Sequence, residues 1–235
     1  MQIEPIAHIH TDFPTKFGVP RQSGLASELT STIVFAPAYR NPDCLRGIAD
    51  FSHLWLIWEF DKVAGAGWSP TVLPPKLGGK TRVGVFATRS PFRPNPLGMS
   101  CVVLTGVRQD AKLGPVLCLS GADLMDGTPV FDIKPYLPYS DCFPDARAGF
   151  TALAPDLLLD VDFPPELLAH IPEVHRSALL GVLSHDPRPS YQDDPARRYG
   201  MGFAGFDIHF TVSEGRLTVV DVVPMEPSEK GSASQ

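Results

Sequence analysis

The chain has 235 residues, among them 25 prolines and 20 glycines, and a formal net charge of −6 at pH 7. A negative net charge argues against a generic nucleic-acid binder, because the neutralisation of phosphates needs a basic surface. The first residues do not combine a basic segment with an apolar run, and no later run approaches the roughly 20 apolar residues that span a bilayer. We therefore expect a soluble cytoplasmic protein with no membrane segment.

The frequent prolines and glycines divide the chain into short pieces, which favours strands and turns over long helices. One short helix is predicted at 41–51, where Asn41 can cap the helix and Pro42 occupies its first position. Because strand follows strand with little room for crossover helices, the pattern favours an antiparallel barrel or a sandwich. Apolar and alternating runs predict these strands at 2–10, 29–35, 53–60, 82–89, 97–110 and 114–124.

The pattern changes in the second part of the chain. Residues 164–186 have apolar side chains at helical spacing and predict two short helices broken at Pro172. Residues 203–223 predict a hairpin that turns at a Ser-Glu-Gly sequence, and the last ten residues have the composition of a disordered tail. We expect two domains, 1–145 and 146–235, of which the second is small and α+β.

Several common enzyme motifs are absent. No Gly-rich dinucleotide-binding fingerprint and no phosphate-binding P-loop occurs, which argues against Rossmann and P-loop enzymes. His8 and His10 are two residues apart on a predicted strand, so we expect them to share one face of that strand rather than to bind a metal. The four cysteines are far apart and form no C-x-x-C pair. Reduced thiols, with no disulfide and no metal site, are therefore expected.

Basic residues are concentrated in one stretch. From Lys62 to Gln109 the chain has seven lysines and arginines and no acidic residue. Inside it, ATRSPFRPNPLGM (87–99) places Arg89 and Arg93 among three prolines, which reduce the conformational freedom of the loop. A stiff loop with two guanidinium groups is suited to bind a carboxylate or a phosphate. The alternative is a proline-rich turn whose arginines pair with local acids, but no acid lies within twenty positions of Arg89.

A second cluster, at 123–141, contains four acids, a lysine and two tyrosines around an Asp-Gly turn. The strand that follows this turn would place Asp132, Lys134 and Tyr136 on one face, because side chains in a strand alternate with a period of two. A carboxylate, an ammonium and a phenol in a row suit proton transfer and polar recognition. An edge strand with a solvated face explains the same spacing equally well.

Five segments of the sequence resemble one protein family. They are KFGVPRQ (16–22), FSHLWLIWEF (51–60), ATRSPFRPNPLGMS (87–100), DGTPVFDIKPY (126–136) and DPRPSY (186–191). They are similar to the motifs of the TsaA-like or YaeB-type family, which includes the TrmO methyltransferases. The resemblance implies a mainly β protein, with an antiparallel β-barrel as N-terminal domain and a small α+β C-terminal domain. It also implies methylation of N6 of N6-threonylcarbamoyladenosine, next to the anticodon of threonine tRNA, with S-adenosylmethionine as cofactor.

The resemblance extends to individual residues. Cofactor contacts are implied in the P-R-Q segment, after the H-L-W strand, in the arginine loop and in the D-G-T-P turn. The residues at these positions are Pro20, Arg21, Gln22, Asp61, Lys62, Arg89, Met99, Asp126, Gly127, Thr128 and Pro129.

The implied reaction needs a proton acceptor and a cation. The N6 nitrogen is a poor nucleophile while protonated, so a base or a phenol must take its proton, and Asp132 or Tyr136 is the predicted group. Arg93 or Lys134 is predicted to bind the threonyl carboxylate through charge-assisted hydrogen bonds.

The partners follow from the same resemblance. We expect the basic stretch to contact the anticodon loop of the tRNA, and a homodimer is implied. Asp186, Arg188 and Tyr191 are expected either to contact RNA or a second subunit, or to pack the small domain on the barrel as a proline-fixed turn. Two other hypotheses remain open at this stage. One is a non-catalytic β-barrel that senses S-adenosylmethionine or another anionic metabolite, and the other is a methyltransferase with a different acceptor.

Overall fold

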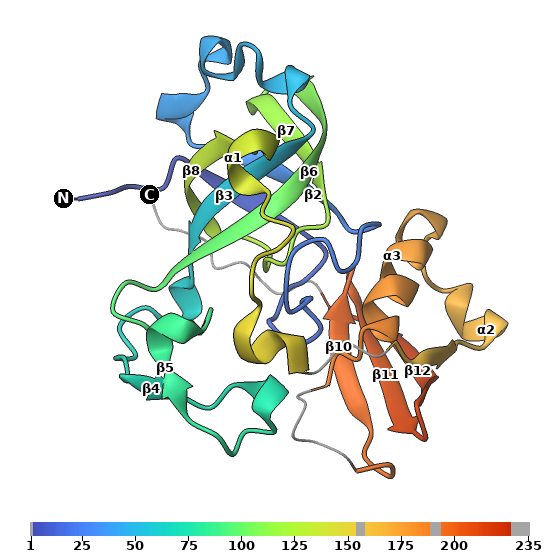
Figure 1. Ribbon diagram of the computed structural model, residues 1–235. Helices are drawn as coiled ribbons and strands as arrows, with labels where there is room; N and C mark the ends of the chain where they lie inside the picture. Colours follow the sequence, from blue (N-terminus) through green and yellow to red (C-terminus); the bar gives the residue numbers. More distant parts are fainter. Residues whose placement is uncertain (1, 154–157, 189–193, 227–235) are drawn as a thin grey trace.

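The computed structural model describes residues 2–153, 158–188 and 194–226, and most of its regular structure is β-strand (Figure 1). Six antiparallel strands form the larger sheet in the order β1-β2-β7-β6-β3-β8, and β8 pairs back with β1. The sheet therefore closes on itself as a barrel. Its strands are β1 (Ala7–His10), β2 (Thr30–Phe35), β3 (His53–Glu59), β6 (Leu97–Asp110), β7 (Gly114–Ser120) and β8 (Pro129–Pro135).

The interior of the barrel is built by alternation along the strands. In β3 the side chains of Leu54, Leu56 and Trp58 are buried, and the residues between them are partly exposed. This is the pattern expected for a strand with one face toward a core, because successive side chains point to opposite faces. Buried side chains from all six strands, such as Ile9 of β1 and Ile33 of β2, join in one hydrophobic cluster.

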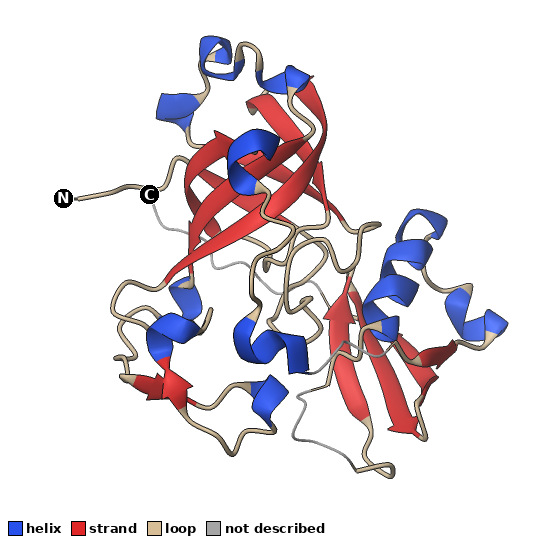
Figure 2. Cartoon of the chain, in the orientation of Figure 1, coloured by secondary structure: helices blue, strands red, loops and turns tan. Residues whose placement is uncertain are grey.

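Short elements surround the barrel. Between β3 and β6, the chain forms a small two-stranded sheet of β4 (Thr71–Val72) and β5 (Val83–Gly84), which lies beyond one end of the barrel (Figure 2). The other short elements up to residue 153 are η1 (Pro37–Tyr39), η2 (Pro42–Leu45), η3 (Ile48–Asp50), η4 (Asp61–Val63), η5 (Pro75–Leu77), η6 (Val85–Ala87), α1 (Pro138–Asp141) and η7 (Gly149–Leu153).

The C-terminal part forms a second sheet of four strands in the order β10-β11-β12-β9, in which β9 runs parallel to β12. Helix α3 packs against this sheet through Ala178, Leu179, Val182 and Leu183, all of which are buried (Figure 1). The elements of this part are β9 (Asp160–Asp162), α2 (Pro165–Leu168), α3 (Glu173–Ser184), β10 (Tyr199–Phe203), β11 (Phe206–Ser213) and β12 (Arg216–Pro224).

The segment between β1 and β2, residues 11–29, connects the barrel to the second sheet, and we call it the connecting segment. Its side chains of Phe13, Ala26 and Leu29 are buried in the same hydrophobic cluster as α3 and strands β10 to β12. The core of the C-terminal part is therefore completed by residues from the beginning of the chain. An ion pair between Asp12 and His175 of α3, at 3.0 Å, adds a polar contact at the same junction.

The prediction of a mainly β protein with a large antiparallel sheet and a small C-terminal domain that contains a sheet is confirmed. The two helices broken at Pro172 and the C-terminal hairpin are also present. The helix predicted at 41–51 is wrong, because this segment forms two separate 3-10 helices, with Gly47 in a left-handed conformation between them. The strand predicted at 82–89 is also wrong beyond Gly84, where the chain turns into η6.

The domain division near residue 145 stays a prediction, and the predicted tail lies outside the described residues from 227 onward. In the described part of the chain, no helix combines the length and the apolar character needed to cross a membrane.

Gly18 gives a test of the junction between the two parts. Its φ is +91°, and a Cβ atom there would lie 2.1 Å from Sδ of Met201, a buried residue of β10. Gly24 also has a positive φ, +80°, but nothing lies within 4 Å of its Cβ position. We expect Gly18→Ala to lower the free energy of unfolding by about 1–3 kcal/mol more than Gly24→Ala, because only the first variant overpacks a core. Urea unfolding followed by circular dichroism measures both, and equal losses would contradict the proposed contact.

Candidate functional site

A pocket of about 630 Å³ opens at the end of the barrel where β3 ends and β6 begins. Its walls come from four segments that are far apart in the sequence, within 16–22, 58–63, 88–99 and 123–128. Its lining combines apolar side chains, such as Trp58 of β3, with charged side chains, such as Arg89 and Asp123. This combination of an apolar wall and a few charged groups is typical of a small-molecule site.

Most of the predicted cofactor residues line this one pocket, although they come from all four segments. Asp126, Gly127 and Pro129 do not line it and lie in the turn and strand directly behind it. The predicted residues in the wall are Pro20, Arg21, Gln22, Asp61, Lys62, Arg89, Met99 and Thr128, and Arg93 of the predicted reaction site joins them.

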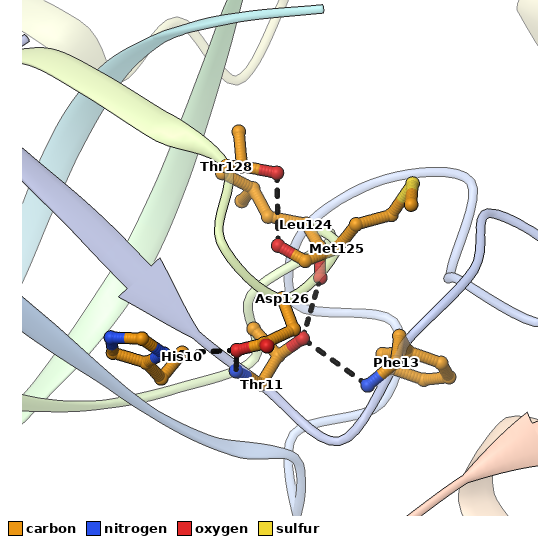
Figure 3. Close-up of polar contacts among 7 residues, drawn as sticks. All are labelled: His10, Thr11, Phe13, Leu124, Met125, Asp126 and Thr128. Carbon is orange, nitrogen blue, oxygen red and sulfur yellow. Dashed lines mark hydrogen bonds and ion pairs between the residues drawn. The ribbon is translucent and has the colours of Figure 1, made fainter. Parts of the chain in front are cut away.

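The Asp-Gly turn next to the pocket is bonded to the end of β1 and the residue after it (Figure 3). Oδ1 of Asp126 accepts a hydrogen bond from the backbone N–H of Thr11 at 3.3 Å and lies 3.0 Å from Nδ1 of His10. Gly127 has a φ of +77°, a conformation that favours glycine, and its N–H donates to the carbonyl of Ile9 at 2.8 Å. These contacts attach the turn to the end of β1. Their effect is to hold the buried residue Thr128 in the pocket wall.

Arg89 is held by the connecting segment. Its Nη1 donates a hydrogen bond to Oε1 of Gln22, and Nε2 of Gln22 donates to the carbonyl of Arg21 at 2.5 Å. Arg21 in turn donates to the carbonyl of Arg188 at 3.1 Å. A polar chain therefore runs from the arginine loop through residues 21 and 22 to the C-terminal part of the protein.

This chain bears on the predicted roles of the D-P-R-P-S-Y segment. Arg188 forms an ion pair with Asp186, with Nε 2.8 Å from Oδ1 and Nη2 2.9 Å from Oδ2. With the bond from Arg21, these contacts of residues 186–188 favour the interpretation in which Asp186 and Arg188 pack the small domain against the barrel side. Tyr191 lies outside the described residues.

The arginine loop is ordered by its own hydrogen bonds. Nη1 of Arg93 donates to the carbonyl of Thr88 at 3.2 Å, and the hydroxyl of Thr88 accepts from the N–H of Ser90 at 3.2 Å. Within the residues that the structure describes, neither Arg89 nor Arg93 forms an ion pair with a carboxylate. The alternative hypothesis, in which the two arginines form ion pairs with nearby acidic residues, is therefore not supported by the described residues. Both guanidinium groups remain able to bind an anion from solution.

Asp123 is a pocket residue that the sequence analysis did not single out. Its Oδ1 accepts a hydrogen bond of 2.5 Å from the hydroxyl of Ser100, which accepts a bond of 2.9 Å from Nε1 of Trp58. Ser100 and Trp58 are buried, so this chain of bonds is rigid. Burial raises the pKa of the Asp123 carboxyl above its ordinary value, against the opposing effects of the Ser100 hydrogen bond and the Arg89 charge. A signal was present in the sequence, because Asp123 is the first of the four acids in the 123–141 cluster.

The three predicted reaction residues on β8 and directly after it, Asp132, Lys134 and Tyr136, lie outside the pocket wall. Lys134 and Asp132 do share a face, as predicted, and form an exposed ion pair of 2.8 Å. Asp132 is opposite Ile57 in the sheet, and the other neighbour of Ile57 is the pocket residue Met99. The outer face of β8 is therefore continuous with the rim of the pocket through two strands.

Tyr136 lies further from the pocket along the same face, since its backbone N–H donates to the carbonyl of His53 at the start of β3. Its ring contacts that of Trp55, with 6.0 Å between ring centroids. Desolvation and the neighbouring Cys142 raise the pKa of its phenol, which therefore stays protonated at neutral pH. A protonated phenol acts as a hydrogen-bond donor rather than as a base. No cluster of His, Cys, Asp or Glu suited to a metal occurs in the described ranges.

Comparisons with known proteins agree with this architecture. The family model of the tRNA-methyltransferase O N-terminal domain matches residues 8–142, and the model of the TrmO C-terminal domain matches residues 157–225. The chain belongs to the TrmO family. The resemblance inferred from the five motifs is therefore confirmed.

Individual relatives match most of the chain. A protein of Escherichia coli K12 named "tRNA (adenine(37)-N6)-methyltransferase" is 38% identical over 231 residues, which are 95% of this chain and 98% of the relative. A Pseudomonas aeruginosa protein named "Putative S-adenosylmethionine-dependent methyltransferase RcsF" is 38% identical and covers 88% of this chain and 91% of its own length. A crystal structure of TrmO from P. aeruginosa superposes with a TM-score of 0.76 at 34% identity, covering 95% of this chain and 97% of that one.

The raised pKa of Asp123 predicts a pH-dependent effect on stability. A carboxyl whose pKa is higher in the folded than in the unfolded protein destabilises the fold as pH rises from the ordinary value, 3.8, through the raised value. Asp123→Asn keeps an oxygen that can accept from Ser100 and removes this penalty. We expect the variant to melt at a higher temperature than the wild type at pH 7, with a difference that shrinks toward pH 4.

Asp110 is the matched control, because hydrogen bonds from the N–H groups of Lys112 and Leu113 lower the pKa of its carboxyl. Asp110→Asn should therefore lose stability at pH 7 and approach the wild type at low pH. A melting temperature of Asp123→Asn that stays below that of the wild type across this pH range would show that the buried carboxylate is not a source of strain.

Proposed function

We propose that this protein is a tRNA methyltransferase that uses S-adenosylmethionine to methylate N6 of N6-threonylcarbamoyladenosine beside the anticodon of threonine tRNA. The observation that carries the proposal is the pocket, where residues from four separate family motifs meet around one cavity. The names of the relatives support the general reaction, since one is a tRNA adenine-N6 methyltransferase and another carries the name of an S-adenosylmethionine-dependent enzyme.

The pocket has the size and the chemistry for this cofactor. Its volume of about 630 Å³ lies within the range of roughly 300–1,000 Å³ for small-molecule sites. The cofactor carries an ammonium, a carboxylate, a sulfonium and an adenosine, so it needs groups of both charges and apolar walls. Asp61 and Asp123 would face its positive groups, Arg89 its carboxylate, and Trp58 and Met99 its apolar parts. When bound, it supplies an electrophilic methyl group.

The residues of the chain then have to position the adenosine and remove a proton. N6 of the modified adenosine is conjugated with the purine and with a carbamoyl group, so it reacts only as its proton leaves. The carboxylate of Asp123 accepts that proton in our proposal, because it lines the pocket and its pKa, raised by desolvation, makes it a stronger base than an exposed aspartate. The hydrogen bond from Ser100 orients it.

The β8 residues remain an alternative for the same step. Asp132 is a candidate base and Lys134 a candidate partner for the threonyl carboxylate, but they bond to each other and lie beside the pocket rather than in it. Arg93 lines the pocket and forms no ion pair within the described residues, so it is the better candidate for the carboxylate.

Specificity for an RNA base fits the position of the pocket. Proteins recognise RNA sequence mostly in unpaired loops, whose bases can be turned out of the stack into a site. The pocket is bordered by the stretch from 62 to 109, which has no acidic residue and is therefore locally positive on a negatively charged chain. A homodimer in the cytoplasm, as implied by the family resemblance, is part of the proposal.

The reaction and the acceptor are tested together. The protein is incubated with S-adenosylmethionine carrying a labelled methyl group and with threonine tRNA, with or without its threonylcarbamoyl group, and the RNA is digested to nucleosides. We expect label only on the modified adenosine. Label on unmodified tRNA would overturn the acceptor, and cofactor binding without transfer to either RNA would support a non-catalytic sensor instead.

The proton acceptor is tested by two matched variants. We expect Asp123→Asn to lower kcat by about 10²–10⁴-fold and to remove the limb of the pH-rate profile that reports the base, because an amide cannot take the proton. Asp132→Asn should stay within a few-fold of the wild type. The opposite result, with activity lost only in Asp132→Asn, would assign the base to β8.

A further inference from the structure

The excursion of the chain between β3 and β6, residues 64–96, carries an unusual number of exposed aromatic side chains, and we call it the β4–β5 lobe. Trp68 is 55% exposed and Phe86 is 76% exposed. Phe92 is 45% exposed and lies in the wall of the pocket. Monomeric soluble proteins rarely expose several large aromatic side chains in one region of their surface. Such a group therefore indicates a surface that contacts a partner.

Trp68 and Phe86 flank the small β4–β5 sheet in the chain, since Trp68 comes shortly before β4 and Phe86 shortly after β5. Strands β4 and β5 pair through Thr71 with Gly84, and the N–H of Val85 donates to the carbonyl of Pro70 at 3.0 Å. Residues 70–72 therefore run beside residues 83–85, and Trp68 and Phe86 follow in the chain just beyond the same end of this pairing. Val85 is buried and anchors this corner, and the 3-10 helix η6 directs the next side chain, Phe86, into solvent.

The positive charge of the lobe indicates which class of partner it binds. The lobe contains Lys76, Lys80, Arg82, Arg89 and Arg93 and no acidic residue. Nη1 of Arg82 donates to the hydroxyl of Thr71 at 3.0 Å, which places a guanidinium on the β4–β5 sheet itself. Aromatic side chains interleaved with cations, without acids, match an unpaired nucleic acid, whose bases stack on the rings while its phosphates meet the cations.

We propose that Trp68 and Phe86 are a stacking platform for the unpaired nucleotides next to the adenosine that enters the pocket. The inference rests on the proposed function and adds the part of the protein that binds the rest of the anticodon loop. Phe92, a third exposed aromatic residue of the same lobe, lies in the pocket wall itself. The lobe thus holds the neighbouring bases while one base is turned into the pocket.

The platform is tested by binding, without any methyl transfer. An unmodified anticodon stem-loop of threonine tRNA is titrated into the full chain, and affinity is measured together with tryptophan fluorescence. We expect Trp68→Ser and Phe86→Ser each to weaken binding by about 5- to 150-fold, the equivalent of roughly 1–3 kcal/mol per stacked base. Trp68→Phe, which keeps a ring, should retain most of the affinity and lose the fluorescence quenching that RNA causes in the wild type.

The matched control is Tyr139→Ser. Tyr139 is the most exposed of the large hydrophobic side chains described, but it lies on α1 close to Asp141 rather than among cations. This variant should bind RNA like the wild type. Calorimetric binding of S-adenosylmethionine should be unchanged in all four variants, because none of these residues lines the pocket.

Each other outcome contradicts a defined part of the proposal. Wild-type affinity in Trp68→Ser and Phe86→Ser, with methyl transfer intact, would overturn the platform and leave the proposed function standing. A change from dimer to monomer in these variants, measured by light scattering, with unchanged RNA affinity per subunit, would assign the surface to a second copy of the chain. Cofactor binding by the wild type without any RNA binding would overturn both proposals.

Discussion

The end of the barrel at which the pocket opens depends on one contact, the pairing of Trp58 in β3 with Gly98 in β6. A Cβ atom at residue 98 would lie 2.3 Å from the indole ring of Trp58, so only glycine allows the ring to lie against the backbone of β6. In this position the indole N–H reaches the hydroxyl of Ser100, two residues further along β6. The same ring thus closes the end of the barrel core and begins the chain of hydrogen bonds to Asp123.

That chain explains why a charged group is tolerated at the barrel end. A buried carboxylate is costly unless hydrogen bonds and charges compensate for lost hydration. Ser100 and the charge of Arg89 compensate in part, and the pKa of Asp123 remains raised because burial outweighs them. An ionised group that destabilises the fold and faces a pocket is typical of functional sites. At such sites proteins lose some stability in exchange for reactivity. By contrast, the exposed pair of Asp132 and Lys134 carries no such cost, since water solvates both side chains.

The sequence was sufficient to predict the approximate positions of the barrel strands, and the motif resemblance was sufficient for most pocket segments. Neither could predict what depends on tertiary contacts. Alternation along residues 53–60 predicted β3, and the prolines around Arg89 and Arg93 predicted an ordered cationic loop. Period-two spacing also placed Asp132 and Lys134 correctly on one face. It could not tell whether that face points into the pocket or beside it, because this depends on the place of β8 in the closed barrel, between β1 and β3. Asp123 was missed for a related reason, since its importance comes from burial and from Ser100, which lies 23 residues away.

The connecting segment could not be predicted either, because Phe13, Ala26 and Leu29 follow no periodic pattern and find their core only in elements near the end of the chain. This arrangement has a consequence for the site. Residues 20–22 belong to the same segment, so the loop that holds Arg89 is fixed at both ends by the core of the C-terminal part. Arg21 adds a direct bond to the carbonyl of Arg188. A C-terminal part that is joined to the pocket in this way does more than extend the protein surface, since its core holds both ends of the loop that contains Gln22, the hydrogen-bond partner of Arg89. The positive charge that faces the cofactor in our proposal is therefore positioned by the packing of the second sheet as much as by the barrel that carries it.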